Sequence, residues 1–217
     1  LTASFASVLS CYEIYQHLNH FTRPDLQIHI VRILGMVPIY SVTSFLALVV
    51  KSEQKALMLD VLRDCYEGFV IYNFLVLLIN YAGGDRHLNH SLELQPRMEH
   101  VWPLDLLFPP MKLGSGFMHF VRSACLQFVF VKPAGAIASL YVHSRANSTM
   151  NNAVDNLINQ LPQIPSRTEK SVYFLVSLIN NISVTMALYG LLLFYKAAEP
   201  VLRPYKPLPK FLAVKLV

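Results

Sequence analysis

The chain has 217 residues, of which 54% are hydrophobic and only 14% are charged, and its formal net charge at pH 7 is +5. Soluble globular domains carry about 25% charged residues, so this composition excludes a water-facing surface and predicts an integral membrane protein. The basic residues lie mostly between apolar runs and form no dense cluster with interleaved aromatic residues. We therefore expect the lipid bilayer, and no nucleic acid, as a partner.

Apolar runs long enough to cross a bilayer recur along the chain. A hydrocarbon core about 30 Å thick is crossed by about 20 helical residues. Runs of this kind predict spans at about 1–18, 30–50, 57–82, 116–143 and 172–195, and a sixth span that starts at about 209 and is cut off at Val217. The sequence thus predicts an all-α fold, a polytopic transmembrane helical bundle that forms one domain over residues 1–217. Because Leu1 already lies in an apolar run, we expect the chain to begin within a longer protein.

Prolines and glycines modify these predicted helices. Pro38 and Pro133 lie inside predicted spans, where a proline removes a backbone donor and predicts a helix kink. The pair Gly83-Gly84 predicts the end of the third span. At these positions we therefore expect a bend or an end in helices that the apolar runs alone predict to be straight.

Two longer connections separate the later spans. Residues 83–115 contain Trp102 and several prolines, and we expect a cytoplasmic loop that lies at the membrane interface. Residues 144–171 predict a lumenal loop, with a short amphipathic surface helix near Val154 to Leu161.

The distribution of Lys and Arg predicts the orientation. The loops after spans one, three and five are richer in basic residues than those after spans two and four, which places the former in the cytoplasm. The glycosylation acceptor pattern at Asn147 lies in a loop assigned to the lumen. A second such pattern at Asn89 lies on the opposite side, so only one of the two can be used.

Polar side chains recur at one depth inside the predicted spans. Counted from the lumenal end at about 1.5 Å per residue, Glu67 and Lys132 both lie about 15 Å deep. Because polar groups are costly in lipid, they are expected to face the interior of the bundle and to indicate a site. The candidate polar layer consists of Tyr40, Arg63, Asp64, Glu67, Asn73, Lys132, Asn180 and Asn181.

Three interpretations of this layer are open at the level of sequence. Asp60, Arg63, Asp64 and Glu67 recur every three or four residues, share a helix face and can form a structural ion network. Alternatively, Glu67 and Lys132 are the charged walls of a solute or ion site. In the third interpretation the span is shorter than predicted, and Lys132 extends its ammonium to the membrane interface.

The sequence offers little for catalysis or metal binding. His17 with His20, and His87 with His90, are each three residues apart, but neither pair has a nearby third ligand. The sequence contains no Gly-rich phosphate loop, no nucleophile elbow and no His-Glu zinc motif. We therefore expect no enzyme activity, no metal and no cofactor.

Several strings, in order along the chain, resemble the family of organic solute transporter alpha subunits and transmembrane protein 184. They are IVRIL at 30–34, VPIY at 37–40, VLRDCYEGFVIYNF at 61–74, GGD at 83–85, HVWPL at 100–104, VKP at 131–133, NISV at 181–184 and KPLPKF at 206–211. The resemblance covers essentially the whole chain. It implies a seven-helix membrane protein with its amino terminus outside, so that this chain stops within the sixth helix.

The HVWPL string is similar to the transmembrane protein 184 branch and its fungal-type members. Animal members carry a cysteine cluster in that loop, which this sequence lacks, so lipid anchoring there is not implied. Organic solute transporter alpha moves steroid and bile-acid conjugates with a single-span beta partner. The transmembrane protein 184 branch is linked to endosomal and vacuolar membranes, and the resemblance thus implies one of these or the plasma membrane.

Two hypotheses about function follow. The first is a carrier for amphipathic organic anions or lipid-like solutes, in which Lys132 and Arg63 meet the anionic group. The second is a non-transporting scaffold or trafficking protein that recruits protein partners, or a larger membrane assembly, through residues 83–115. A receptor is a third class, but no sequence feature specifies a G-protein contact.

Overall fold

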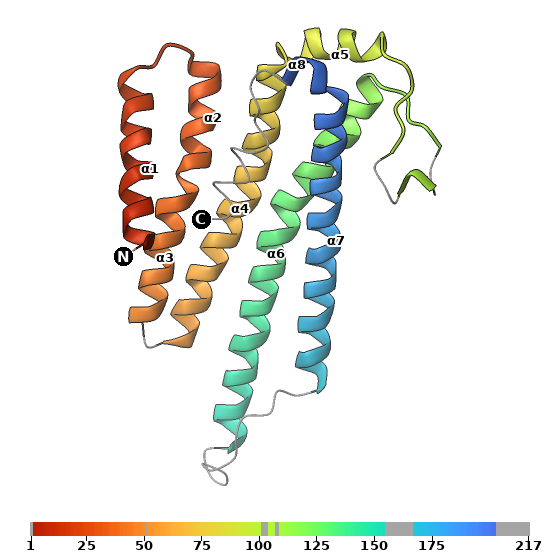
Figure 1. The fold of residues 1–217 in the computed structure, drawn as a ribbon. Coiled ribbons are helices and arrows are strands. Elements are labelled where there is room, and N and C mark those ends of the chain that lie inside the picture. The colour runs from red at the N-terminus through yellow and green to blue at the C-terminus, as the bar shows by residue number, and fades with distance from the viewer. Residues whose placement is uncertain (1, 51, 101–103, 107–108, 155–166, 203–217) are drawn as a thin grey trace.

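The computed structural model describes residues 2–50, 52–100, 104–106, 109–154 and 167–202 (Figure 1). These residues fold as helices, with a single isolated antiparallel bridge between Met98 and Met111. The elements are α1 (Thr2–Asn19), α2 (Pro24–Leu34), α3 (Met36–Val49), α4 (Glu53–Tyr81), α5 (Asp85–Glu93), the 3-10 helix η1 (Leu104–Leu106), α6 (Ser115–Val154), α7 (Arg167–Ala197) and α8 (Glu199–Leu202). The predicted all-α membrane fold is confirmed.

The long helices form a row in which α4 is central. α1 packs on α2 and α3, both of these pack on α4, α4 packs on α6, and α6 packs on α7 (Figure 1). The short helices α5 and α8 lie at the same end of the row, and each contacts α4 (Figure 1). α4 therefore contacts α2 and α3 on one side and α6 on another, so its sequence must provide packing residues on both sides.

Three helical stretches in the described part of the chain are long and apolar enough to cross a membrane, namely Pro24–Val49, Ser115–Val142 and Ser171–Ala197. A fourth results if α4 and α5 count as one broken span. α1 is not among them, since Glu13 and His17 lower its mean hydropathy, and the sixth predicted span lies outside the described residues. The described residues thus contain three to four candidate spans, and the five to six spans expected for the whole chain stay a prediction.

The second predicted span is two helices. α2 begins at Pro24, whose fixed φ suits the first helical position, six residues earlier than the apolar run suggests. The helix breaks at Gly35 and restarts as α3, which carries Pro38 in its first turn. A proline removes the bond to the carbonyl four residues earlier and clashes with that carbonyl, which here belongs to Leu34. The break therefore lies one turn before the proline that predicts it.

The predicted cytoplasmic loop contains a helix. α4 ends at Tyr81, and Gly83 and Gly84 take φ values of 91° and 84°, which favour glycine. The chain turns by 72° into α5, whose Leu88 and Leu92 are fully buried. Leu88 and Leu92 are four residues apart and lie on one helix face, which explains why this mostly polar segment forms a helix against the core. Trp102, expected at the interface, lies outside the described residues.

α6 extends beyond its predicted end at 143 and continues as one helix through Pro133 to Val154. Residues 144–154, which the sequence assigns to the lumenal loop, are helical because no Gly or Pro interrupts the chain between Gly135 and Pro162. Asn147 thus lies on a helix, and its glycosylation stays a prediction. The expected amphipathic surface helix falls mostly outside the described residues.

Close helix packing holds the centre of the row. A Cβ placed on Gly68 of α4 would lie 3.1 Å from the Cα of Val129 on α6, and one on Gly190 of α7 would lie 3.2 Å from the Cβ of Ala124. Small residues that allow such approach are the usual means of helix association in membranes. Around these contacts lies a core of buried apolar side chains that includes Phe74, Phe128 and Phe194.

We expect Gly68→Ala to destabilise the protein by about 1–3 kcal/mol, the usual range for overpacking, because α4 and α6 must move apart. The matched control is Gly116→Ala on α6, where a Cβ meets nothing within 4 Å. There we expect a gain of up to about 1 kcal/mol from the helix propensity of alanine. Thermal unfolding in lipid nanodiscs measures both changes. An equal change in Tm for the two variants would contradict the packing account.

Candidate functional site

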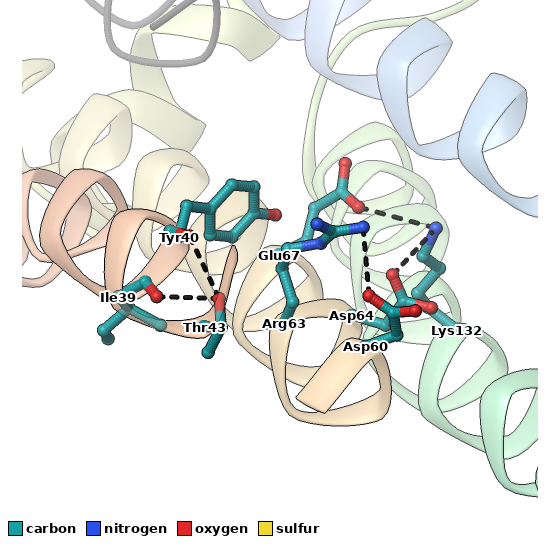
Figure 2. Close-up of polar contacts among 8 residues, drawn as sticks. All are labelled: Ile39, Tyr40, Thr43, Asp60, Arg63, Asp64, Glu67 and Lys132. Carbon is teal, nitrogen blue, oxygen red and sulfur yellow. Dashed lines mark hydrogen bonds and ion pairs between the residues drawn. The ribbon is translucent and has the colours of Figure 1, made fainter. Parts of the chain in front are cut away.

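Opposite charges meet between α4 and α6. The Lys132 Nζ lies 3.4 Å from Asp64 Oδ1 and 3.5 Å from Glu67 Oε2 (Figure 2). The three side chains are between 19% and 27% exposed. Asp64 and Glu67 are three residues apart, which brings both carboxylates to one helix face. The structure thus brings Glu67 and Lys132 together, and the ammonium reaches across to α4 rather than along α6 to an interface.

Arg63 and Tyr40 extend these contacts toward α3. The Arg63 guanidinium lies 3.4 Å from Asp60 Oδ1, and its central carbon lies 5.6 Å from the centre of the Tyr40 ring, within cation–π range. The side chains follow one another from α3 across α4 to α6 (Figure 2). We call this set the polar belt; it comprises Tyr40, Asp60, Arg63, Asp64, Glu67 and Lys132.

The polar belt is nearly self-compensating in charge. Its three carboxylates and two cations give a net charge of −1 when all are ionised. Pairing of this kind lowers the cost of placing charges within a membrane span. The belt therefore offers hydrogen-bond donors and acceptors to a ligand, but its net charge does not attract an anion.

Asn73, assigned to the same layer by sequence, lies on the side of α4 that packs on α2. Its Oδ1 lies 2.9 Å from His29 Nδ1 and 3.2 Å from Arg32 Nη1. Its Nδ2 donates to the Phe69 carbonyl at 2.8 Å, and the residue is 2% exposed. His29 and Arg32 were missed as site residues, although a charge inside the apolar run IVRIL was a visible signal.

The two asparagines of α7 do not act as a pair. Asn180 lies against Gly135 of α6, where a Cβ would come within 2.8 Å of the amide, and its Oδ1 is buried without a hydrogen-bond partner among the described residues. Asn181 is exposed and donates from Nδ2 to the Ser177 carbonyl of its own helix at 2.9 Å. Gly135 follows Lys132 by three residues, so Asn180 lies close to the belt, and Asn181 does not join it.

A family model for the organic solute transporter Ostalpha matches residues 1–217, the whole of the chain. The chain belongs to this family. No solved structure matches it. Family membership assigns the protein to organic solute transporters, and the finer resemblance to fungal-type transmembrane protein 184 stays a prediction.

In this Ostalpha-family chain, α6 and α7 share a second set of polar contacts. Gln127 Nε2 donates to the Ser183 carbonyl at 3.0 Å, and Ser183 Oγ donates back to Gln127 Oε1 at 3.1 Å. Such reciprocal bonds satisfy polar groups inside the bilayer and hold helices together. In the described part of the chain, no group of three or more His, Cys, Asp or Glu side chains is placed to hold a metal ion.

We expect Lys132→Met to destabilise this Ostalpha-family chain by up to about 3 kcal/mol, because the ion pair is partly buried and the cost of removing one partner from a fully buried pair is about 3–5 kcal/mol. The variant leaves Asp64 and Glu67 as like charges one turn apart. Asp64→Asn and Glu67→Gln should each cost less than about half as much, since the ammonium keeps one carboxylate.

Chemical unfolding in detergent micelles, followed by circular dichroism, measures these differences. The triple variant with all three side chains neutralised serves as the control, and it should recover most of the loss. An equal loss in all three single variants would show that Lys132 does not bridge the carboxylates.

Proposed function

We propose that this chain carries amphipathic organic solutes across a membrane, with the polar belt as the element that contacts the solute's charged or polar group. The observation that supports this most directly is that ionic side chains of α4 and α6, with the Tyr40 ring of α3 beside them, converge inside segments that otherwise suit lipid (Figure 2). Ionisable groups at such positions are costly and mark substrate pathways by default. Membership of the Ostalpha family supports the class of solute.

The belt's cations have donors to spare for a ligand. An ammonium has three N–H donors, and among the described residues Lys132 contacts two carboxylates. A guanidinium has five donors in a planar fork, while Arg63 contacts one carboxylate and the Tyr40 ring. A carboxylate or sulfate group of a solute can therefore replace one internal partner without leaving either cation unpaired.

The same helices expose large apolar side chains close to the belt. Phe45 of α3, Leu62 of α4 and Phe130 of α6 are each more than half exposed and lie within two turns of a belt residue. Such surfaces contact lipid chains and the apolar body of an amphipathic molecule equally well. A solute with one polar end and one apolar body thus fits this arrangement better than a small hydrophilic one.

The test is uptake of a radiolabelled sulfated steroid by proteoliposomes. We expect Lys132→Ala to reduce the initial rate at least ten-fold and Lys132→Arg to retain most of it, because the second variant keeps a cation for the carboxylates and the solute. Lys55→Ala, an exposed lysine at the start of α4, is the matched control and should transport normally.

Uptake equal to that of empty liposomes for the unmodified chain would refute transport of this solute class. Normal uptake by Lys132→Ala would refute the role of the belt and leave transport standing. The unfolding measurement described above separates a lost function from a lost fold.

We further propose that the chain is of the fungal-type transmembrane protein 184 branch and resides in endosomal or vacuolar membranes. The support is the HVWPL string, which lacks the cysteines of animal members. We expect a fluorescent fusion of the protein to coincide with endosomal and vacuolar markers in fungal cells. Signal confined to the plasma membrane would contradict this location.

The scaffold hypothesis rests on a free loop at 83–115. In the structure, α5 occupies the first part of that segment, and its buried leucines pack against the core. Less of the segment is therefore available to partners than its length suggests, and recruitment of proteins through it stays a prediction.

A further inference from the structure

Arg32 carries a charge that no carboxylate balances in the described part of the chain. Every ion pair found there involves Arg63, Arg122 or Lys132. The Arg32 guanidinium instead contacts neutral groups, since it donates to Asn73 Oδ1 at 3.2 Å and lies 5.7 Å from the centre of the Phe69 ring. A cation held only by neutral groups in a membrane span is costly, and an anion that reached it would lower that cost.

The surroundings hold Arg32 in place. Tyr66 of α4 donates its hydroxyl to the Arg32 carbonyl at 2.6 Å. Asn73, which meets the guanidinium, is buried and anchored to the Phe69 carbonyl. A guanidinium fixed in this way presents its planar fork with less loss of side-chain entropy, and the fork matches carboxylate, sulfate and phosphate oxygens.

His29 belongs to the same network, and the contact of Arg32 with Asn73 indicates which nitrogen of its ring carries the hydrogen. A guanidinium only donates hydrogen bonds, so the Asn73 atom that faces Arg32 must be its oxygen. The same oxygen lies 2.9 Å from His29 Nδ1, and therefore Nδ1 carries the hydrogen. Nε2 then has no hydrogen in the neutral ring and can only accept a bond, so the donor that this network offers to an anion is the Arg32 guanidinium.

A cavity of about 810 Å³ opens beside His29, between the turn that joins α1 to α2 and the bend that joins α4 to α5. Its volume lies in the range of small-molecule sites, about 300–1,000 Å³. The lining combines apolar and polar side chains, among them Phe21, Arg23, Asp25, Ile28, His29 and Asn80. Arg23 and Asp25 offset each other in charge. Arg32 does not line the cavity but follows His29 by about one turn of α2.

We propose that this cavity and the Arg32 guanidinium, which lies about one turn further along α2 than His29, together form a binding site for an amphipathic ligand with an anionic group. The ligand's carboxylate, sulfate or phosphate accepts hydrogen bonds from the Arg32 fork, and its apolar body lies against Phe21 and Ile28 of the cavity. The polar belt has a net negative charge, so this site provides the electrostatic attraction that the belt lacks.

The binding site itself does not depend on the proposed transport function. That function is needed only for the further statement that the bound ligand is also the transported solute. Two sources share the chemistry, namely a soluble organic anion and the headgroup of an anionic phospholipid. Binding without flux is therefore the suitable measurement, because a protein that binds but does not transport keeps the site and loses the proposed function.

The experiment measures equilibrium binding of a radiolabelled sulfated steroid to the full chain in phosphatidylcholine nanodiscs. We expect the sulfated steroid to bind at least ten-fold more tightly than its uncharged parent, and Arg32→Gln to remove that preference. Arg86→Gln is the matched control, because Arg86 is an exposed arginine of α5 at the same end of the row. Its affinity should stay within two-fold of the unmodified chain.

Asn73→Asp is the second variant, and it keeps the side-chain size. It places a carboxylate beside the Arg32 guanidinium, so the protein satisfies its own cation and the anion preference should fall at least ten-fold. The variant also loses the bond from residue 73 to the Phe69 carbonyl, so thermal unfolding is measured beside binding to show that the variant is folded. Replacing part of the phosphatidylcholine by phosphatidylglycerol then distinguishes the sources. Displacement of the steroid assigns the site to phospholipid headgroups, and undiminished binding assigns it to the soluble anion.

Equal binding of the sulfated and uncharged steroids to the unmodified chain would overturn the proposal, whatever the variants do. An anion preference that survives both Arg32→Gln and Asn73→Asp would overturn it as well, since the anion then binds elsewhere. Transport that depends on Lys132 but not on Arg32 would leave the polar belt as the functional site.

Discussion

The close approach of α4 and α6 at Gly68 is the contact on which the polar belt depends. Asp and Glu have short side chains, and they reach Lys132 at 3.4 and 3.5 Å only because no side chain separates the two backbones one turn away. The same approach allows Phe74 and Phe128 to be buried. The same separation of α4 and α6 therefore allows both the ion pairs of Lys132 and the burial of the two phenylalanines. A larger separation would weaken both.

The two groups of charges meet the cost of residing in a membrane in different ways. The polar belt compensates its cations internally with carboxylates, whereas Arg32 is compensated only by an amide oxygen and an aromatic ring. Internal pairs compete with a ligand and keep its affinity low, while an unbalanced cation favours a ligand of opposite charge. A carrier needs a site that attracts its solute and a passage from which the solute can leave, and one kind of environment cannot provide both.

Sequence reasoning located most of the long helices and the pair of Glu67 and Lys132. It missed α5, it predicted a kink rather than a break between α2 and α3, and it did not show in which direction a side chain points around its helix. Depth counting brought Glu67 and Lys132 to one level because both counts use the same helical rise. It could not separate Asn73 from Glu67, since six residues turn the helix by about 240° and point the two side chains to different neighbours. Likewise, Asn180 and Asn181 differ by about 100° in direction, and only Asn180 faces α6.

The break between α2 and α3 connects the two charged regions through α4. Pro38 cannot donate a backbone bond, and the helix opens before it at Gly35. There the Tyr66 hydroxyl occupies space that any side chain at residue 35 would need, at 2.6 Å from a Cβ, and it donates to the Arg32 carbonyl. α4 therefore holds Arg32 through Tyr66 and Asn73 on one side, and Lys132 through Asp64 and Glu67 on another. One helix thus carries the contacts of both charged regions, which lie on different sides of it.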